Sequence, residues 1–133
     1  MEGKPIILAV DDEEESLGLF RRMLKKEDYT VLTADNSRGA IELVERERLD
    51  LVILNLKKSG MNEIEILRRI KRIDENIEVI IITGYGTMKA ARIAMKLGAY
   101  DYITRPFNND YITALIKSAL SPVSENLLQL ELK

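Results

Sequence analysis

Short apolar runs alternate with amphipathic stretches along this chain. Five of the runs have the length and composition of β-strands. They are Ile6–Val10, Thr30–Ala34, Leu51–Leu54, Val79–Ile82 and Tyr100–Ile103. The third and fourth runs are apolar at every position, which is typical of strands that other elements cover on both faces.

The stretches between these runs carry apolar residues at helical spacing and predict helices. They are Glu14–Glu27, Ser37–Glu47, Asn62–Ile73, Thr87–Leu97 and Asn108–Leu120. Asn62 and Glu65 have the spacing of a capping box, and Gly98 is a typical stop for the fourth helix. Strict alternation of strands and helices predicts an α/β fold, a single doubly wound sheet of five parallel strands with helices on both faces.

Polar residues stand where the predicted strands end. Asp11 and Asp12 follow the first strand, Asn55 the third, Thr83 the fourth, and Arg105 comes shortly after the fifth. In doubly wound sheets the ligand site lies at the carboxyl ends of the strands. We therefore expect these residues to converge on one edge of the sheet, although they are far apart in sequence.

The pair Asp11-Asp12 opens an acidic turn that has two explanations. Three glutamates follow directly, at positions 13–15. Asp12 can cap the next helix with Glu15 completing the capping box, because acids are favoured at a helix N-terminus. Alternatively, the two carboxylates can hold Mg²⁺, which proteins bind through one or two carboxylates plus water.

The composition of the chain excludes several classes of function. Lys+Arg 20 against Asp+Glu 22 gives a net charge of -2, so we expect no nucleic acid contact by this segment. The chain has no cysteine and no histidine, which excludes disulfides, thiolate metal sites and histidine-based catalysis. The run Ile6–Val10 is too short for a signal peptide or a membrane span, and we expect a cytoplasmic protein without membrane contact.

The pattern breaks at Ser121-Pro122. We therefore predict a domain over residues 1–121 and a tail over 122–133. The tail contains Leu127, Leu128, Leu130 and Leu132. It is either a frayed terminus or the start of an amphipathic linker helix.

From about Pro5 to Leu120 the chain resembles the receiver domain of two-component response regulators. Several spaced motifs in the same order carry the resemblance. They are Ile6-Ile7-Leu8-Ala9-Val10-Asp11-Asp12-Glu13, Asp50-Leu51-Val52-Ile53-Leu54, Gly60-Met61-Asn62 and the stretch from Ile82 to Phe107. The last stretch is similar to receivers of sigma-54-dependent activators, which implies a role in transcription regulation.

The resemblance implies a phosphorelay site. Asp11 and Asp12 would hold Mg²⁺ together with the backbone carbonyl of Lys57. Residue 55 would be the phosphoryl acceptor. The cation at position 105 would contact the phosphoryl oxygens.

The resemblance also implies a switch and partners. Thr83 would donate its hydroxyl to the phosphoryl group, and Tyr102 would turn inward as Thr83 moves. The surface of residues 87–120 would then change its preference for protein partners. These would be a histidine kinase, an output domain or a second copy of the chain.

The chain departs from the family pattern at the centre of this site. Asn55 replaces the acceptor aspartate, and an amide has no nucleophilic oxygen for attack on phosphorus. The loss of one carboxylate also weakens the expected Mg²⁺ binding. Arg105 replaces a lysine, Lys58 and Ser59 replace an apolar residue and proline, and Glu63 stands where glycine is common.

The resulting interpretation is a pseudo-receiver, a signalling module without enzymatic activity that acts by protein contacts independently of phosphorylation. We add the hypothesis that Arg105 reaches the acid pair and takes the place of the metal. The alternative is an ordinary receiver in which Asn55 was engineered to block phosphorylation. The further changes at Lys58, Ser59, Glu63 and Arg105 favour natural divergence.

Two other classes share parts of this pattern. A flavodoxin-like cofactor protein has the same expected fold, but it needs a turn after the first strand that cradles phosphate, and the acidic turn here would repel phosphate. A phosphatase of the haloacid dehalogenase type uses two aspartates separated by one residue, whereas Asp11 and Asp12 are adjacent.

Overall fold

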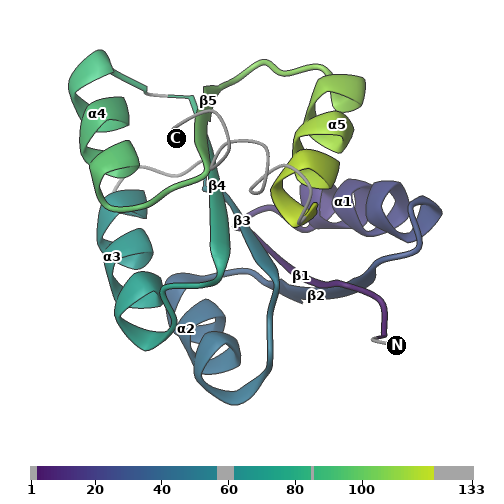
Figure 1. Ribbon diagram of the computed structural model, residues 1–133. Helices are drawn as coiled ribbons and strands as arrows, with labels where there is room; N and C mark the ends of the chain where they lie inside the picture. The colour runs from purple at the N-terminus through teal and green to yellow at the C-terminus, as the bar shows by residue number, and fades with distance from the viewer. Residues whose placement is uncertain (1–2, 57–61, 85, 122–133) are drawn as a thin grey trace, which may run out of the picture.

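A five-stranded parallel sheet with helices on both faces makes up the described part of the chain (Figure 1). The computed structural model describes residues 3–56, 62–84 and 86–121. The strands are β1 (Ile6–Asp11), β2 (Thr30–Ala34), β3 (Leu51–Asn55), β4 (Glu78–Thr83) and β5 (Asp101–Thr104). The helices are α1 (Glu14–Lys26), α2 (Ser37–Arg46), α3 (Glu63–Ile73), α4 (Met88–Lys96) and α5 (Asn109–Leu120).

The strand order is β2-β1-β3-β4-β5, and the predicted fold class is confirmed. Helices α1 and α5 cover one face of the sheet, and α2, α3 and α4 cover the other (Figure 1). Successive strand residues point to opposite faces, so Leu8 and Val10 pack on the α2–α4 side while Ile7 and Ala9 pack on the α1–α5 side. Both faces of the central strands are therefore buried, as their apolar runs predicted.

Four strands, β1, β3, β4 and β5, continue one residue further than predicted at their carboxyl ends. The last residues of β1, β3 and β4 are Asp11, Asn55 and Thr83, which were expected just beyond the strands. The register pairs Asp11 with Asn55, and Asn55 with Ile82 on the next strand. These polar side chains are thus held by the sheet itself and not by loops.

Helix termini follow the sequence signals in part. The side chain of Asn62 accepts a hydrogen bond from the backbone N–H of Glu65 at 3.1 Å, as a capping box requires. The carboxylate of Glu65 turns instead to Arg68, which donates to it at 2.9 Å. Gly98 follows the end of α4 with φ of 103°, a left-handed conformation that glycine adopts without strain.

The predicted tail at 122–133 lies outside the described residues, so the domain boundary stays a prediction. Within the described ranges, no helix combines the length and the apolar character needed to cross a membrane.

Candidate functional site

The carboxylate of Asp11 lies at the carboxyl end of β1 and is fully buried. Its Oδ1 accepts a hydrogen bond from the backbone N–H of Glu13 at 2.9 Å. Its Oδ2 accepts one from Nδ2 of Asn55, also at 2.9 Å. Burial of a charge is costly unless donors surround it, and these two donors provide that compensation.

The acidic turn differs from the capping prediction. Helix α1 starts at Glu14 with Glu13 at the N-cap position, so the explanation in which Asp12 caps this helix is wrong. Asp11 fills the related role, because its carboxylate accepts the N–H of Glu13 two residues later. In this local turn, one oxygen of the buried aspartate accepts a backbone hydrogen bond.

Asn55 links the two ends of the site. It is 2% exposed, lies beside Asp11 in the sheet register, and accepts a hydrogen bond on Oδ1 from Nη1 of Arg105 at 2.7 Å. A carboxylate can only accept and a guanidinium can only donate. The neighbours therefore fix the amide orientation, with NH₂ toward Asp11 and oxygen toward Arg105.

Arg105 is placed by the end of β4. Its backbone N–H donates to the carbonyl of Thr83 at 2.7 Å, and its Nη1 also lies 3.5 Å from the carbonyl oxygen of Ile82. A Cβ on Gly84 would come within 2.8 Å of Nη2, so glycine at this position leaves the room that the guanidinium occupies. The sequence hypothesis that Arg105 reaches the acid pair needs a correction, because its contact to Asp11 runs through the amide of Asn55.

Thr83 and Tyr102 approach each other around Gly86. Thr83 is 2% exposed at the end of β4. A Cβ on Gly86 would lie 3.2 Å from Cε1 of Tyr102 and 3.3 Å from the methyl group of Thr83. The ring of Tyr102 is half-buried and packs against the core on the α2–α4 side. The two predicted switch residues are therefore neighbours in the fold.

Burial raises the pKa of the Tyr102 hydroxyl, and the negative charge of Glu63 raises it further. Glu63, at a position where the resemblance leads us to expect glycine, is the first residue of α3. Lys58 and Ser59, two further expected departures, lie outside the described residues.

The residues present fit a divalent cation poorly. Lys57, whose carbonyl is an expected ligand, lies outside the described residues. Asn55 presents an NH₂ donor to Asp11, whereas a cation needs oxygen ligands on that side. Within the described ranges there is no group of three or more aspartate, glutamate, histidine or cysteine residues able to hold a metal.

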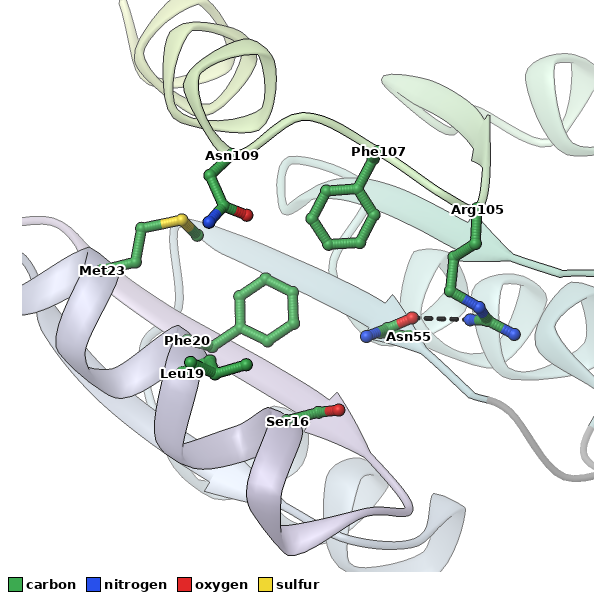
Figure 2. Close-up of a pocket in the computed structure, with 8 residues that line it drawn as sticks. All are labelled: Ser16, Leu19, Phe20, Met23, Asn55, Arg105, Phe107 and Asn109. Carbon is green, nitrogen blue, oxygen red and sulfur yellow. Dashed lines mark hydrogen bonds between the residues drawn. The ribbon is translucent and has the colours of Figure 1, made fainter.

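A pocket beside the site was not predicted from the sequence. It has a volume of about 150 Å³ and opens between α1 and the segment that joins β5 to α5. Figure 2 shows its eight lining residues, with Asn55 and Arg105 at one end. The rings of Phe20 and Phe107 stack inside it with centroids 6.4 Å apart. Phe107 follows a proline and lies outside any periodic run, so the sequence pattern does not predict that it lines a pocket with Phe20.

Comparison with known proteins gives a consistent result. Residues 7–117 match the family described as the response regulator receiver domain. The chain is 42% identical over 120 residues to sporulation initiation phosphotransferase F of Bacillus subtilis, covering 90% of this chain and 96% of that protein. It is 41% identical over 115 residues to an NtrX-like response regulator of Rickettsia bellii, covering 85% of this chain and 24% of that protein.

Among solved structures, the fold is similar to a response regulator receiver domain protein (CheY-like) from Methanospirillum hungatei. The TM-score is 0.83 at 26% identity, covering 89% of this chain and 94% of that one. The chain therefore spans almost the whole of one relative and about a quarter of the NtrX-like one.

Proposed function

Because this chain belongs to the response regulator receiver domain family of two-component signalling, we propose that it is a pseudo-receiver that signals without being phosphorylated. Receivers are signalling modules that accept a phosphoryl group rather than classical enzymes. Here the module acts through protein contacts alone. The observation that carries the proposal is the buried amide of Asn55, which is hydrogen-bonded to both Asp11 and Arg105.

Asn55 takes the place of the phosphoryl acceptor in this proposal. The proposal is supported by the place of Asn55 at the end of β3, beside Asp11 in the sheet register. An amide nitrogen shares its lone pair with the carbonyl, and the amide oxygen carries no full negative charge, so neither atom attacks phosphorus as a carboxylate does. Residue 55 therefore cannot accept a phosphoryl group.

The charges of the site support the same interpretation. In a receiver with an aspartate at position 55, two carboxylates would face each other at the ends of β1 and β3, and a cation would have to separate them. Here the amide offers a donor to Asp11 and an acceptor to Arg105. The polar groups are satisfied without metal or phosphate, and in the described part of the chain no buried side-chain nitrogen or oxygen lacks a hydrogen-bond partner. We infer that Mg²⁺ binding by Asp11 and Asp12 is weak.

The remaining receiver roles are proposed as follows. Arg105 occupies the phosphate-contact position and stabilises the site in one state through Asn55. Thr83 and Tyr102 remain a coupled pair that senses rearrangement of this site, since both side chains approach the position that a Cβ on Gly86 would take.

The proposed partners are proteins. Receiver domains interact with histidine kinases and output domains, and the surface made by α4, β5 and α5 is our candidate for these contacts or for a homodimer through residues 87–120. Large apolar side chains are exposed on it, among them Met88 and Met95 at 71% and 47%. The NtrX-like relative is about four times longer than the matched segment, so transcription regulation through a further domain is part of the proposal. We propose no nucleic acid contact by this segment.

The test is intact mass spectrometry after incubation with a small phosphodonor and Mg²⁺. The native chain is compared with Asn55→Asp and with the double variant Asn55→Asp/Arg105→Lys. We expect no phosphoryl adduct on the native chain. A labelled native chain would overturn the proposal, because the acceptor would then lie elsewhere.

The two variants separate natural divergence from a blocked but otherwise ordinary receiver. If Asn55→Asp alone is labelled, the pocket is sound and only the acceptor is missing, which favours the engineered alternative. If labelling needs the second change or fails in both variants, the surroundings of residue 55 have diverged as well. The double variant tests whether arginine at position 105, in place of the expected lysine, belongs to that divergence.

A further inference from the structure

The pocket beside Asn55 has apolar walls and stays open to solvent. Helix α1 supplies Leu19, Phe20 and Met23, and the segment that joins β5 to α5 supplies Phe107. Leu19 is 56% exposed at its rim, which leaves a large aliphatic side chain incompletely buried. Burial of such surface by an apolar ligand is favourable.

The size of the pocket limits what it holds. An apolar cavity of about 150 Å³ accommodates a molecule the size of benzene, and this pocket has a volume of about 150 Å³. The stacked rings of Phe20 and Phe107 form its inner wall. A compact ring or branched aliphatic group fits against these rings, whereas a nucleotide or a flavin is too large.

The polar end of the pocket selects the charge of the ligand. Of the eight lining residues, Arg105 is the one that carries a charge, and none of the acids at positions 11–15 lines the pocket. Among the described residues, both side-chain hydrogen bonds of Arg105 leave from Nη1, while a guanidinium has five N–H donors in a planar fork. The carboxylate of Asp11 is bonded to the intervening amide of Asn55. Nε and Nη2, the latter beside Gly84, thus remain as donors to a carboxylate, the group that a guanidinium pairs with best.

We propose that this pocket binds a small monocarboxylic acid with a benzene-sized apolar body. The body lies against Phe20 and Phe107, and the carboxylate pairs with Arg105. Such a ligand binds the same guanidinium that donates a hydrogen bond to Asn55. Ligand binding therefore changes the surroundings of the Asn55 amide at the end of β3. The proposal uses the pocket and Arg105 only and holds whether or not residue 55 can be phosphorylated.

The test is an NMR titration of the full chain with phenylacetate, followed by backbone and side-chain amide shifts. Phenylacetamide is the control for charge, and acetate is the control for the apolar body. We expect saturable shifts at Phe20, Phe107 and the Asn55 side chain with phenylacetate. Each control should bind at least about tenfold more weakly, since charge-assisted hydrogen bonds and ring burial each contribute more than a factor of ten.

Two variants with the same chemical change provide the matched comparison. Leu19→Asp places a negative charge at the rim of the pocket, and Met88→Asp places one at an exposed residue of α4. Both positions are exposed, so both variants should fold. We expect Leu19→Asp to weaken phenylacetate binding at least about tenfold and Met88→Asp to leave it unchanged.

Three results would overturn the proposal. The first is the absence of saturable shifts with phenylacetate. The second is equal binding of phenylacetamide, which would remove the role of Arg105. The third is equal weakening by the two aspartate variants, which would place the ligand elsewhere. None of these readouts involves phosphorylation, so they are independent of the test of the proposed function.

Discussion

The guanidinium of Arg105 donates a 2.7 Å hydrogen bond to the side-chain oxygen of Asn55, a residue 50 positions earlier in the chain. The same amide donates to the fully buried carboxylate of Asp11. A cation and an anion are therefore joined through a neutral side chain that can both donate and accept. Aspartate has no donor for Asp11, so these contacts depend on the amide.

The variant Asn55→Asp should lower the free energy of unfolding by about 1–3 kcal/mol in the absence of a divalent cation. It replaces the donor facing Asp11 by a second carboxylate, and the pair with Arg105 offsets only part of the repulsion. Added Mg²⁺ should restore stability in the variant more than in the native chain. Urea denaturation with and without Mg²⁺ measures both effects.

The control for this variant is Asn108→Asp, at the N-cap of α5. There the side chain accepts hydrogen bonds from the N–H groups of Asp110 at 2.7 Å and Tyr111 at 3.1 Å, and aspartate accepts as well as asparagine. Little change and no Mg²⁺ dependence are expected. Equal behaviour of the two variants would show that the amide at position 55 has no special electrostatic role.

A double-mutant cycle between Asn55→Ala and Arg105→Met should give a coupling free energy of about 1 kcal/mol. Each single change removes one end of the same hydrogen bond, so the second change costs less once the first is made. Arg38→Met is the comparison, because the Arg38 side chain is 90% exposed in its pair with Glu42 and exposed pairs contribute little. Strict additivity of the Asn55 and Arg105 changes would contradict the geometry described here.

The sequence was sufficient for the architecture but imprecise at the strand ends. The runs that became β3 and β4 are fully buried, and their apolar composition reflects that. Asp11, Asn55 and Thr83 were expected beyond the strands because they are polar. Backbone pairing does not depend on side-chain polarity, and these residues continue the sheet.

The convergence of the site was also predictable, since parallel strands bring their carboxyl ends to one edge. Which side chains contact each other within the site was not predictable. Whether Arg105 meets Asp11 directly or through Asn55 depends on side-chain direction over a few ångströms, which sequence spacing does not encode. The pocket was missed because its walls come from α1 and from Phe107, which belong to no common periodic pattern.

Alanine substitutions at Gly84 and Gly18 should differ in their effect on Arg105. A Cβ on Gly84 would lie 2.8 Å from Nη2 of Arg105 and displace the guanidinium, whereas a Cβ on Gly18 would meet its nearest atom, on Arg22, at an ordinary 3.7 Å. Gly18 lies inside α1, so Gly18→Ala should stabilise the protein by about 0.5–1 kcal/mol. Gly84→Ala should shift the NMR signals of the Asn55 side-chain amide. Unchanged signals in Gly84→Ala would contradict the placement of Arg105.

The hydroxyl of Tyr102 should ionise at a higher pH than a free tyrosine, whose pKa is about 10. Burial raises its pKa, and the charge of Glu63 raises it further. Since the folded-state pKa lies above the unfolded one, the contribution to stability is fully present below about pH 10 and is lost as the pH rises through the folded-state pKa. NMR of the labelled Tyr102 ring, with Tyr102→Phe for assignment, follows the titration. Glu63→Gln should lower the pKa of Tyr102 toward the free value, and an unchanged titration in that variant would show that Glu63 does not act on the ring.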